Sequence, residues 1–200
     1  MRVLLLTTHF NTGGITSYVL SLSDALVRQG HQVIVVSSGG NAVDRLEAAC
    51  IKHIRLNIKV KSELHPKVFW ALPKLKEILV AEKIDLIHAQ TRVTQVIGTL
   101  LSSMTGVPLI TTCHGFFRPR FWRRYFGCWG RKVIAISKPV AQHLQHDLKV
   151  DPENIILIRN GIDLALFRMT DDLLRQQQRR LWSIDRAQGQ DFILRIRSRT

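Results

Sequence analysis

The stretch that decides the fold is THFNTGGITSYVLSLSDALVRQGHQVIVVSS, residues 8–38. Apolar residues recur at helical spacing from Ile15 to Leu26, and Gly30 follows as a helix stop. The next residues, HQVIVVSS, form a continuous apolar run with the length of a buried strand. Because another apolar run, RVLLLT, precedes the helix at residues 2–7, the sequence predicts a strand–helix–strand unit with parallel strands.

The same alternation continues along the chain. Further strands are predicted at HIRLN, IDLIHA, VPLITTCH, RKVIAIS and NIILIRNG, and helices over residues 41–50, 66–83, 91–105 and 138–148. Pro73 is expected to kink or split the helix over 66–83. The pattern predicts an α/β fold, Rossmann-like, with a mostly parallel sheet and helices on both faces. We expect residues 1–167 to form this domain and residues 168–200, rich in Arg and Gln, to be a linker and the start of a second domain.

The composition of the chain indicates which kinds of partner it binds and in which cellular compartment it lies. The chain has 29 Lys and Arg against 15 Asp and Glu, a formal net charge of +14, which favours an anionic partner such as a membrane surface, a phosphorylated ligand or nucleic acid. Its three cysteines form no C-x-x-C pair, which favours a reducing compartment. No window has the apolar length of a membrane span, and the opening MRVLLLTTHF is too short for a signal peptide. We expect a cytoplasmic protein, either in solution or peripheral on the inner face of the membrane.

Two glycines, Gly13 and Gly14, stand where the first strand passes into the helix. A helix N-terminus offers free N–H groups and a partial positive charge, and both favour a diphosphate. Glycine there lets a ligand come close to the backbone. The alternative is a tight turn that needs a positive φ, and spacing alone does not separate the two interpretations.

Two histidines end neighbouring predicted strands. His88 ends DLIHA, and His114 ends LITTCH and is followed by Gly115. Because the carboxyl ends of parallel strands share one edge of a sheet, we expect these residues near Gly13. A structural role is the alternative for each histidine; in the functional interpretation, His114 donates a hydrogen bond to a sugar or phosphate oxygen or takes part in proton transfer. A dyad with Cys113 is disfavoured, because neighbours in a strand point to opposite faces.

The strongest chemical signal lies in HGFFRPRFWRRYFGCWGRK, residues 114–132. We call residues 116–132 the basic–aromatic segment, because rings alternate there with Arg and Lys and no acidic residue intervenes. Three interpretations stay open: contact with anionic lipid or a lipid acceptor, stacking of single-stranded nucleic acid, or a short helix with buried rings and solvated arginines. The residues predicted to contact the membrane or acceptor are Arg118, Arg120, Phe121, Trp122, Arg123 and Arg124.

Taken in order, these pieces resemble the N-terminal, acceptor-side domain of family 4 glycosyltransferases, which have the GT-B fold. The matching pieces are TGGI, ALVRQGHQVIVVS, IDLIHAQ, GVPLITTCHG, VIAISKPVAQHL and NIILIRNGIDLALF, within residues 2–167. The resemblance implies metal-independent transfer of a sugar, with retention of configuration, from a nucleotide diphosphate sugar to an acceptor such as a lipid-linked or cell-envelope saccharide. The nucleotide sugar is a co-substrate, and no other cofactor is implied. The sequence has no Asp-x-Asp metal-binding pair.

The resemblance also implies roles for single residues. Gly13 and Gly14 would lie against the donor diphosphate and the acceptor, and His114 near the transferred sugar. His88 would lie on the acceptor side, with Gly115 among the substrate-binding residues. Asn160 matches the turn that leads into the interdomain linker.

One departure from the family pattern is large. The Arg/Lys pair and the two glutamates of the family's nucleotide-sugar domain have no counterpart after DFILRIRSRT. We therefore expect a truncated or split transferase that is inactive without a separate C-terminal domain chain. The alternative is a non-catalytic fragment that binds an anionic membrane or a lipid-linked acceptor through residues 116–132. Nucleic acid is the least favoured partner, because it rests on charge alone.

Overall fold

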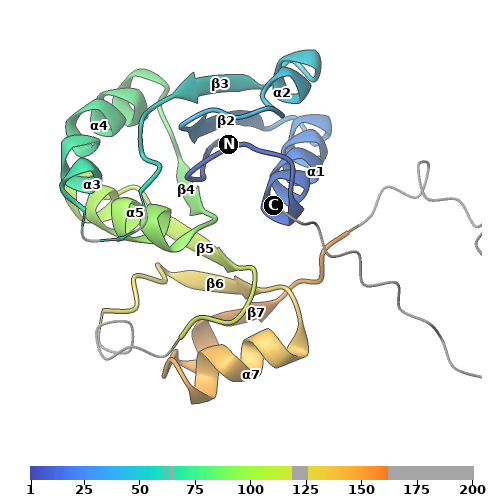
Figure 1. Cartoon of the computed structure of the whole chain (residues 1–200), viewed down its shortest axis with the longest axis vertical. Coiled ribbons are helices and arrows are strands. Elements are labelled where there is room, and N and C mark those ends of the chain that lie inside the picture. Colours follow the sequence, from blue (N-terminus) through green and yellow to red (C-terminus); the bar gives the residue numbers. More distant parts are fainter. Residues whose placement is uncertain (61, 64, 119–125, 162–200) are drawn as a thin grey trace, which may run out of the picture. The chain divides into compact units, whose positions relative to one another are not determined.

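A seven-stranded parallel sheet forms the centre of the molecule (Figure 1). The structure is a computed structural model that describes residues 1–60, 62–63, 65–118 and 126–161. The strand order is β3-β2-β1-β4-β5-β6-β7, and every neighbouring pair is parallel. The predicted fold class is thereby confirmed. The strands are β1 (Arg2–Leu6), β2 (Gln32–Ser37), β3 (Lys52–Arg55), β4 (Leu86–Ala89), β5 (Leu109–Cys113), β6 (Lys132–Ala135) and β7 (Ile155–Leu157).

Helices connect the strands, as the alternation of patterns predicts. They are α1 (Gly14–Arg28), α2 (Asp44–Ala48), α3 (Pro66–Trp70), α4 (Leu72–Ala81), α5 (Arg92–Thr105) and α7 (Lys138–His146), with a 3-10 turn at Pro152–Asn154. The helix expected over 66–83 is split at Ala71, and Pro73 lies in the first turn of α4. Proline lacks an N–H group, so it fits the start of a helix and interrupts its interior.

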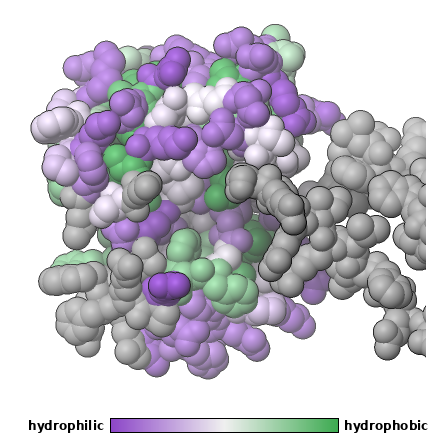
Figure 2. Space-filling view, viewed as in Figure 1, coloured by the Kyte–Doolittle hydropathy of each residue, from purple (hydrophilic) through white to green (hydrophobic). Residues whose placement is uncertain are grey.

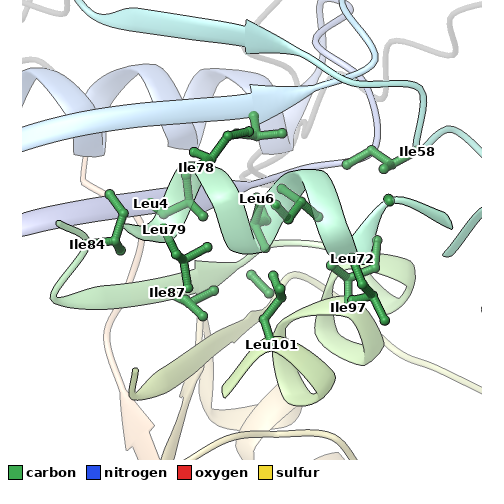
Figure 3. Packing of buried hydrophobic residues seen from close by; sticks show 14 of the residues in the cluster. Leu4, Leu6, Ile58, Leu72, Ile78, Leu79, Ile84, Ile87, Ile97 and Leu101 are labelled. Atoms are coloured by element: carbon green, nitrogen blue, oxygen red, sulfur yellow. The ribbon is translucent and has the colours of Figure 1, made fainter. Parts of the chain in front are cut away.

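The two faces of the sheet are covered by different helices. Leu4 and Leu6 of β1 are buried in a cluster with residues of α3, α4 and α5 (Figure 3). Their strand neighbours Val3 and Leu5 belong to a second cluster, in which Val19 of α1 is buried. The alternation along β1 therefore divides the core into two layers, as expected for a strand buried on both faces.

A third cluster joins the other end of the sheet to α7. Val133 and Ala135 of β6 pack there with Val140 and Leu144 of α7. Cys113 of β5 pairs in register with Ala135 and lies in the same cluster. The part of the sheet that contains β6 is therefore covered by α7.

The chain changes direction across the sheet between β1 and β4. From β1 it proceeds outward to β2 and β3, and from β4 it proceeds the opposite way to β7. In open α/β sheets, ligands bind at the carboxyl ends of the strands at such a reversal. The loops that follow β1, β4 and β5 are therefore where a site is expected.

The described surface is mostly hydrophilic on the face shown in Figure 2, with hydrophobic residues gathered in smaller patches. Among the described residues, no helix combines the length and the apolar character that crossing a membrane requires. The predicted domain boundary at residue 167 and the segment 168–200 lie outside the described residues.

Candidate functional site

The loop between β1 and α1 is held in place by the loop that follows β2. The N–H of Phe10 donates to the carbonyl of Gly39 at 2.9 Å, and the N–H of Ala42 donates to the carbonyl of Phe10 at 3.0 Å. A Cβ at Gly40 would overlap the backbone of Phe10, so only glycine allows the two loops this close together. The loop that leads from β1 into α1 is therefore held in place by the loop that follows β2.

Gly13 and Gly14 form the start of α1. Gly13 precedes the helix with φ 166°, which is extended backbone that any residue adopts, and no side chain caps the helix N-terminus. A Cβ at Gly13 would meet only Asn11 O at 3.9 Å, and one at Gly14 would meet no atom within 4 Å. The alternative of a turn that needs a positive φ is therefore wrong. Neither backbone strain nor crowding within the described residues requires these glycines.

His88 lies inside the protein beneath the edge of the sheet. Its side chain is buried, and Nε2 lies 2.7 Å from Oγ1 of Thr112 on the neighbouring strand. Burial, and to a smaller extent the adjacent His114, lower the pKa of His88 to about 3. His88 supports Thr112 in this arrangement, and its contact with a substrate stays a prediction.

His114 follows β5 and is only partly buried. Its Nε2 lies 2.9 Å from Oε1 of Gln90, the residue that follows β4. The ring of Tyr18, on α1, meets the imidazole edge to face with a centroid distance of 4.8 Å. Burial lowers the pKa of His114 to about 4, so the imidazole is neutral at physiological pH.

Tyr18 links the two histidines. Its hydroxyl lies 3.4 Å from Oγ1 of Thr112, the atom that also contacts His88. Burial raises the pKa of Tyr18, although the hydrogen bond with Thr112 acts in the opposite direction. Tyr18 stands one turn after Gly14 on the same helix, so α1, β4 and β5 are joined in one polar cluster.

Cys113 does not share this cluster. It is buried on the side of the sheet that α7 covers, and its Sγ donates to the carbonyl of Gly115 at 3.2 Å. Burial raises the pKa of the thiol to about 11. A thiolate that works together with His114 is therefore excluded at neutral pH, as the opposite orientation of neighbours in a strand predicts.

Asn160 lies apart from the residues above. It is exposed and follows β7, two strands away from β5 in the sheet order. Within the described part of the chain, no hydrogen bond joins it to His114 or Gln90. Its place in a substrate site stays a prediction.

The basic–aromatic segment begins with residues 116–118, which we call its first stem and which contact α7. The N–H of Phe117 donates to Nε2 of His143 at 3.0 Å, so the proton of this imidazole is on Nδ1, which donates to Asp147 at 2.6 Å. Phe116 packs its ring against His143 at 5.2 Å and is still 69% exposed. Phe116 and Phe117, at the start of the segment, are therefore anchored to α7.

Residues 126–129, which we call the second stem of the segment, contact α5. The guanidinium of Arg92 donates to the carbonyls of Phe126, at 2.9 Å, and Gly127, and lies over the ring of Trp129. Phe126 is 62% exposed. Arg118 is exposed as well, whereas the other predicted contacts, Arg120, Phe121, Trp122, Arg123 and Arg124, lie outside the described residues.

Several residues of the cluster were not identified from the sequence. Gln90 directly follows one predicted strand, and His114 is the last residue of another. This position at the carboxyl end of a strand was the signal that could have identified Gln90. Tyr18 and Arg92 lie on helices, and Thr112 lies inside a strand. Nothing in their local patterns distinguishes them, because their roles depend on which strands are neighbours.

The comparisons with known proteins agree with one another on the fold. The family profile described as "Glycosyltransferase Family 4" matches residues 12–166. A solved glycosyltransferase from Rickettsia africae superposes with a TM-score of 0.75 at 23% identity, over 93% of this chain and 50% of that one. The sheet is therefore one half of a GT-B architecture.

Two curated relatives match over different lengths. A D-inositol 3-phosphate glycosyltransferase of Arthrobacter is 32% identical, over 78% of this chain and 44% of the relative. A UDP-Gal:alpha-D-GlcNAc-diphosphoundecaprenol alpha-1,3-galactosyltransferase of Escherichia coli is 29% identical, over 48% of this chain and 28% of the relative. The chain thus spans less than half the length of either relative.

Proposed function

Because the chain belongs to glycosyltransferase family 4, we propose that it forms the acceptor-side domain of an enzyme that transfers a sugar from a nucleotide diphosphate sugar to a saccharide or lipid-linked acceptor. Residues 1–167 are this domain, and a second Rossmann-like domain facing it binds the nucleotide. Transfer requires both domains, because positive charge must be placed against the leaving diphosphate.

The start of α1 is the observation that carries this proposal. Gly13 and Gly14 leave an uncapped helix N-terminus at the reversal of the sheet, and nothing in the described structure requires glycine there. The partial positive charge and the free N–H groups favour a diphosphate or another anionic group of the ligand. His114 belongs to the same edge through its contact with Tyr18 of α1. The site therefore combines an anion-binding backbone with a neutral imidazole for a sugar.

A substitution at Gly14 tests this use of the helix start. Gly14→Leu is expected to leave the free energy of unfolding within about 0.5 kcal/mol of the parent, because the added side chain meets no atom at its Cβ. The same side chain would occupy the space of a ligand that approaches the backbone. NMR titration with UDP-galactose should therefore move the backbone amide signals of positions 13 and 14 in the parent protein and leave those of the same positions unmoved in Gly14→Leu.

Ser103→Leu is the control for this titration. It adds the same side chain at an exposed position of α5, away from the start of α1, so ligand binding should match the parent. Equal binding of UDP-galactose by Gly14→Leu and the parent would contradict the proposed site.

The acceptor is proposed to be lipid-linked, with the basic–aromatic segment at the membrane surface. Phe116 and Phe126, on its two described stems, keep 69% and 62% of their surface exposed although neighbouring side chains anchor both stems. Exposed rings beside arginines favour an anionic lipid surface. The name of the Escherichia coli relative, which acts on a diphosphoundecaprenol-linked sugar, supports the same acceptor class.

Sedimentation with liposomes tests this second part. Replacement of Arg120, Arg123 and Arg124 by Glu should abolish most binding to vesicles that contain phosphatidylglycerol, because each basic residue near such a surface contributes about 1 kcal/mol. The control carries the same change of net charge at three exposed positions elsewhere, Arg28, Arg45 and Lys83. Equal loss of vesicle binding in both variants would show that binding depends only on net charge. Unchanged vesicle binding in the variant of Arg120, Arg123 and Arg124 would refute the proposed contact.

A further inference from the structure

Gln90 is fixed in the rim of the sheet between β1 and β5. It follows β4 directly, and its backbone N–H donates to the carbonyl of Leu6 at 2.9 Å. Its side chain is almost completely buried, with 2% of the residue surface exposed. Burial restricts the movement of this side chain, and its Oε1 faces His114.

The contact with His114 determines where the imidazole proton lies. Oε1 of Gln90 lies 2.9 Å from Nε2 of His114, and a carbonyl oxygen can only accept a hydrogen bond. With Oε1 facing it, Nε2 of His114 makes this hydrogen bond only when it carries the proton. Since the imidazole is neutral, Nδ1 has a free lone pair.

Within the described residues, no protein group makes a hydrogen bond with Nδ1 of His114. The ring contacts Gln90 through Nε2, and Nδ1 is not a buried atom without a partner. The rings of Tyr18 and His114 pack in a T-shaped arrangement at an interplanar angle of 76°. The imidazole is therefore held by a ring contact with Tyr18 and by the contact of its Nε2 with Gln90.

We propose that Gln90 is a positioning residue that holds His114 as the Nε2–H tautomer, so that Nδ1 accepts a hydrogen bond from the bound ligand. This proposal rests on the proposed function and makes it more specific. The ligand group at Nδ1 must be a donor, such as a sugar hydroxyl or an amide N–H. A phosphoryl oxygen only accepts hydrogen bonds, so it belongs at the start of α1 and not at the His114 side chain.

Gln95 provides a control that separates the effect of Gln90 on the His114 tautomer from the effect of removing a buried amide. Gln95, on α5, is also buried, and its Nε2, like that of Gln90, has no hydrogen-bond partner within the described residues. Its Oε1 contacts Arg92 and not a histidine. Gln90→Leu and Gln95→Leu therefore remove similar buried amides, and only the first removes the acceptor from His114.

The test is ¹⁵N NMR of the histidine side chains in the full chain without ligand. We expect His114 to show a protonated Nε2 and a bare Nδ1 in the parent and in Gln95→Leu, and a mixture of tautomers in Gln90→Leu. A protonated Nδ1 in the parent, or an unchanged tautomer in Gln90→Leu, would overturn the proposal.

Gln90→Glu covers the case in which Gln90→Leu does not fold. A carboxylate at this position still accepts the hydrogen bond from Nε2 and stabilises the charged imidazolium. The Nε2–H tautomer should persist, and the pH midpoint of the His114 signals should move upward from about 4. A midpoint that does not move would show that Gln90 does not contact His114 in solution.

Titration with UDP-galactose then tests the consequence for binding. Loss of one uncharged hydrogen bond predicts affinity about three- to tenfold weaker in Gln90→Leu than in Gln95→Leu, while inorganic diphosphate binds both alike. Equal UDP-galactose affinity in the two variants would overturn the role of Nδ1. If the tautomers behave as expected and the parent binds neither ligand, the proposed anion site at the start of α1 fails and the tautomer assignment stands.

Discussion

His88 and His114 are neutral at physiological pH because burial lowers the pKa of both, to about 3 and about 4. In the unfolded chain a histidine has its ordinary pKa of about 6.5. Between these values the unfolded chain binds protons that the folded protein does not bind. The free energy of unfolding must therefore fall as the pH decreases through this window.

Urea denaturation between pH 7 and pH 4 measures this effect. Lowering of a pKa by one unit corresponds to about 1.4 kcal/mol, so we expect a loss of several kcal/mol over the window. His88→Gln removes one of the two groups and should give a shallower dependence on pH. The same slope in His88→Gln and in the parent would show that His88 is not buried as described.

At the scale of secondary structure, α5 begins with a reciprocal cap. The hydroxyl of Thr91 accepts from the N–H of Thr94, and the Thr94 hydroxyl accepts from the N–H of Thr91. Both backbone donors at the helix start are thereby satisfied. This cap matters for the site because α5 begins immediately after Gln90.

Thr91→Ala should lower the free energy of unfolding by about 1 kcal/mol, as loss of an N-cap usually does. Thr99→Ala, in the interior of the same helix, should be close to neutral because alanine is the better helix former. Thermal denaturation of both variants measures the difference. Equal destabilisation would mean that the cap is not formed.

The same scale shows which element boundaries could be predicted. The split near Pro73 follows from the missing N–H group of proline, and the end of α5 follows from Gly106, which has φ 75°. The strands are shorter than their apolar runs. Ile84 and Val107, for example, are apolar residues in front of β4 and β5 that pack in the core without strand pairing. Burial explains an apolar residue equally well inside and outside a strand.

At the scale of the whole molecule, the largest core cluster joins elements distant in the sequence. Leu75 of α4 is fully buried in the cluster that also contains Leu6 of β1 and Ile97 of α5 (Figure 3). A cavity at this position removes contacts to several elements at once. The stability of the sheet and that of its helix cover are therefore coupled.

Leu75→Ala is expected to lower the free energy of unfolding by about 2–5 kcal/mol in a single cooperative transition. Val80→Ala, on the exposed face of the same helix, should change it by less than about 0.5 kcal/mol. Chemical denaturation monitored by tryptophan fluorescence compares the two. A small effect of Leu75→Ala would place α4 outside the cooperative core.

The sequence by itself determined the strand and helix order, the parallel sheet, the position of Gly13 and Gly14 at the start of a helix, and that of His88 and His114 near strand ends. These follow from local periodicity and from the rule that parallel strands share their carboxyl edge. Only the tertiary structure decided which histidine is enclosed and which nitrogen carries a proton. Those properties depend on residues from other strands and helices, Thr112, Gln90 and Tyr18, whose approach is set by the strand order and leaves no local pattern.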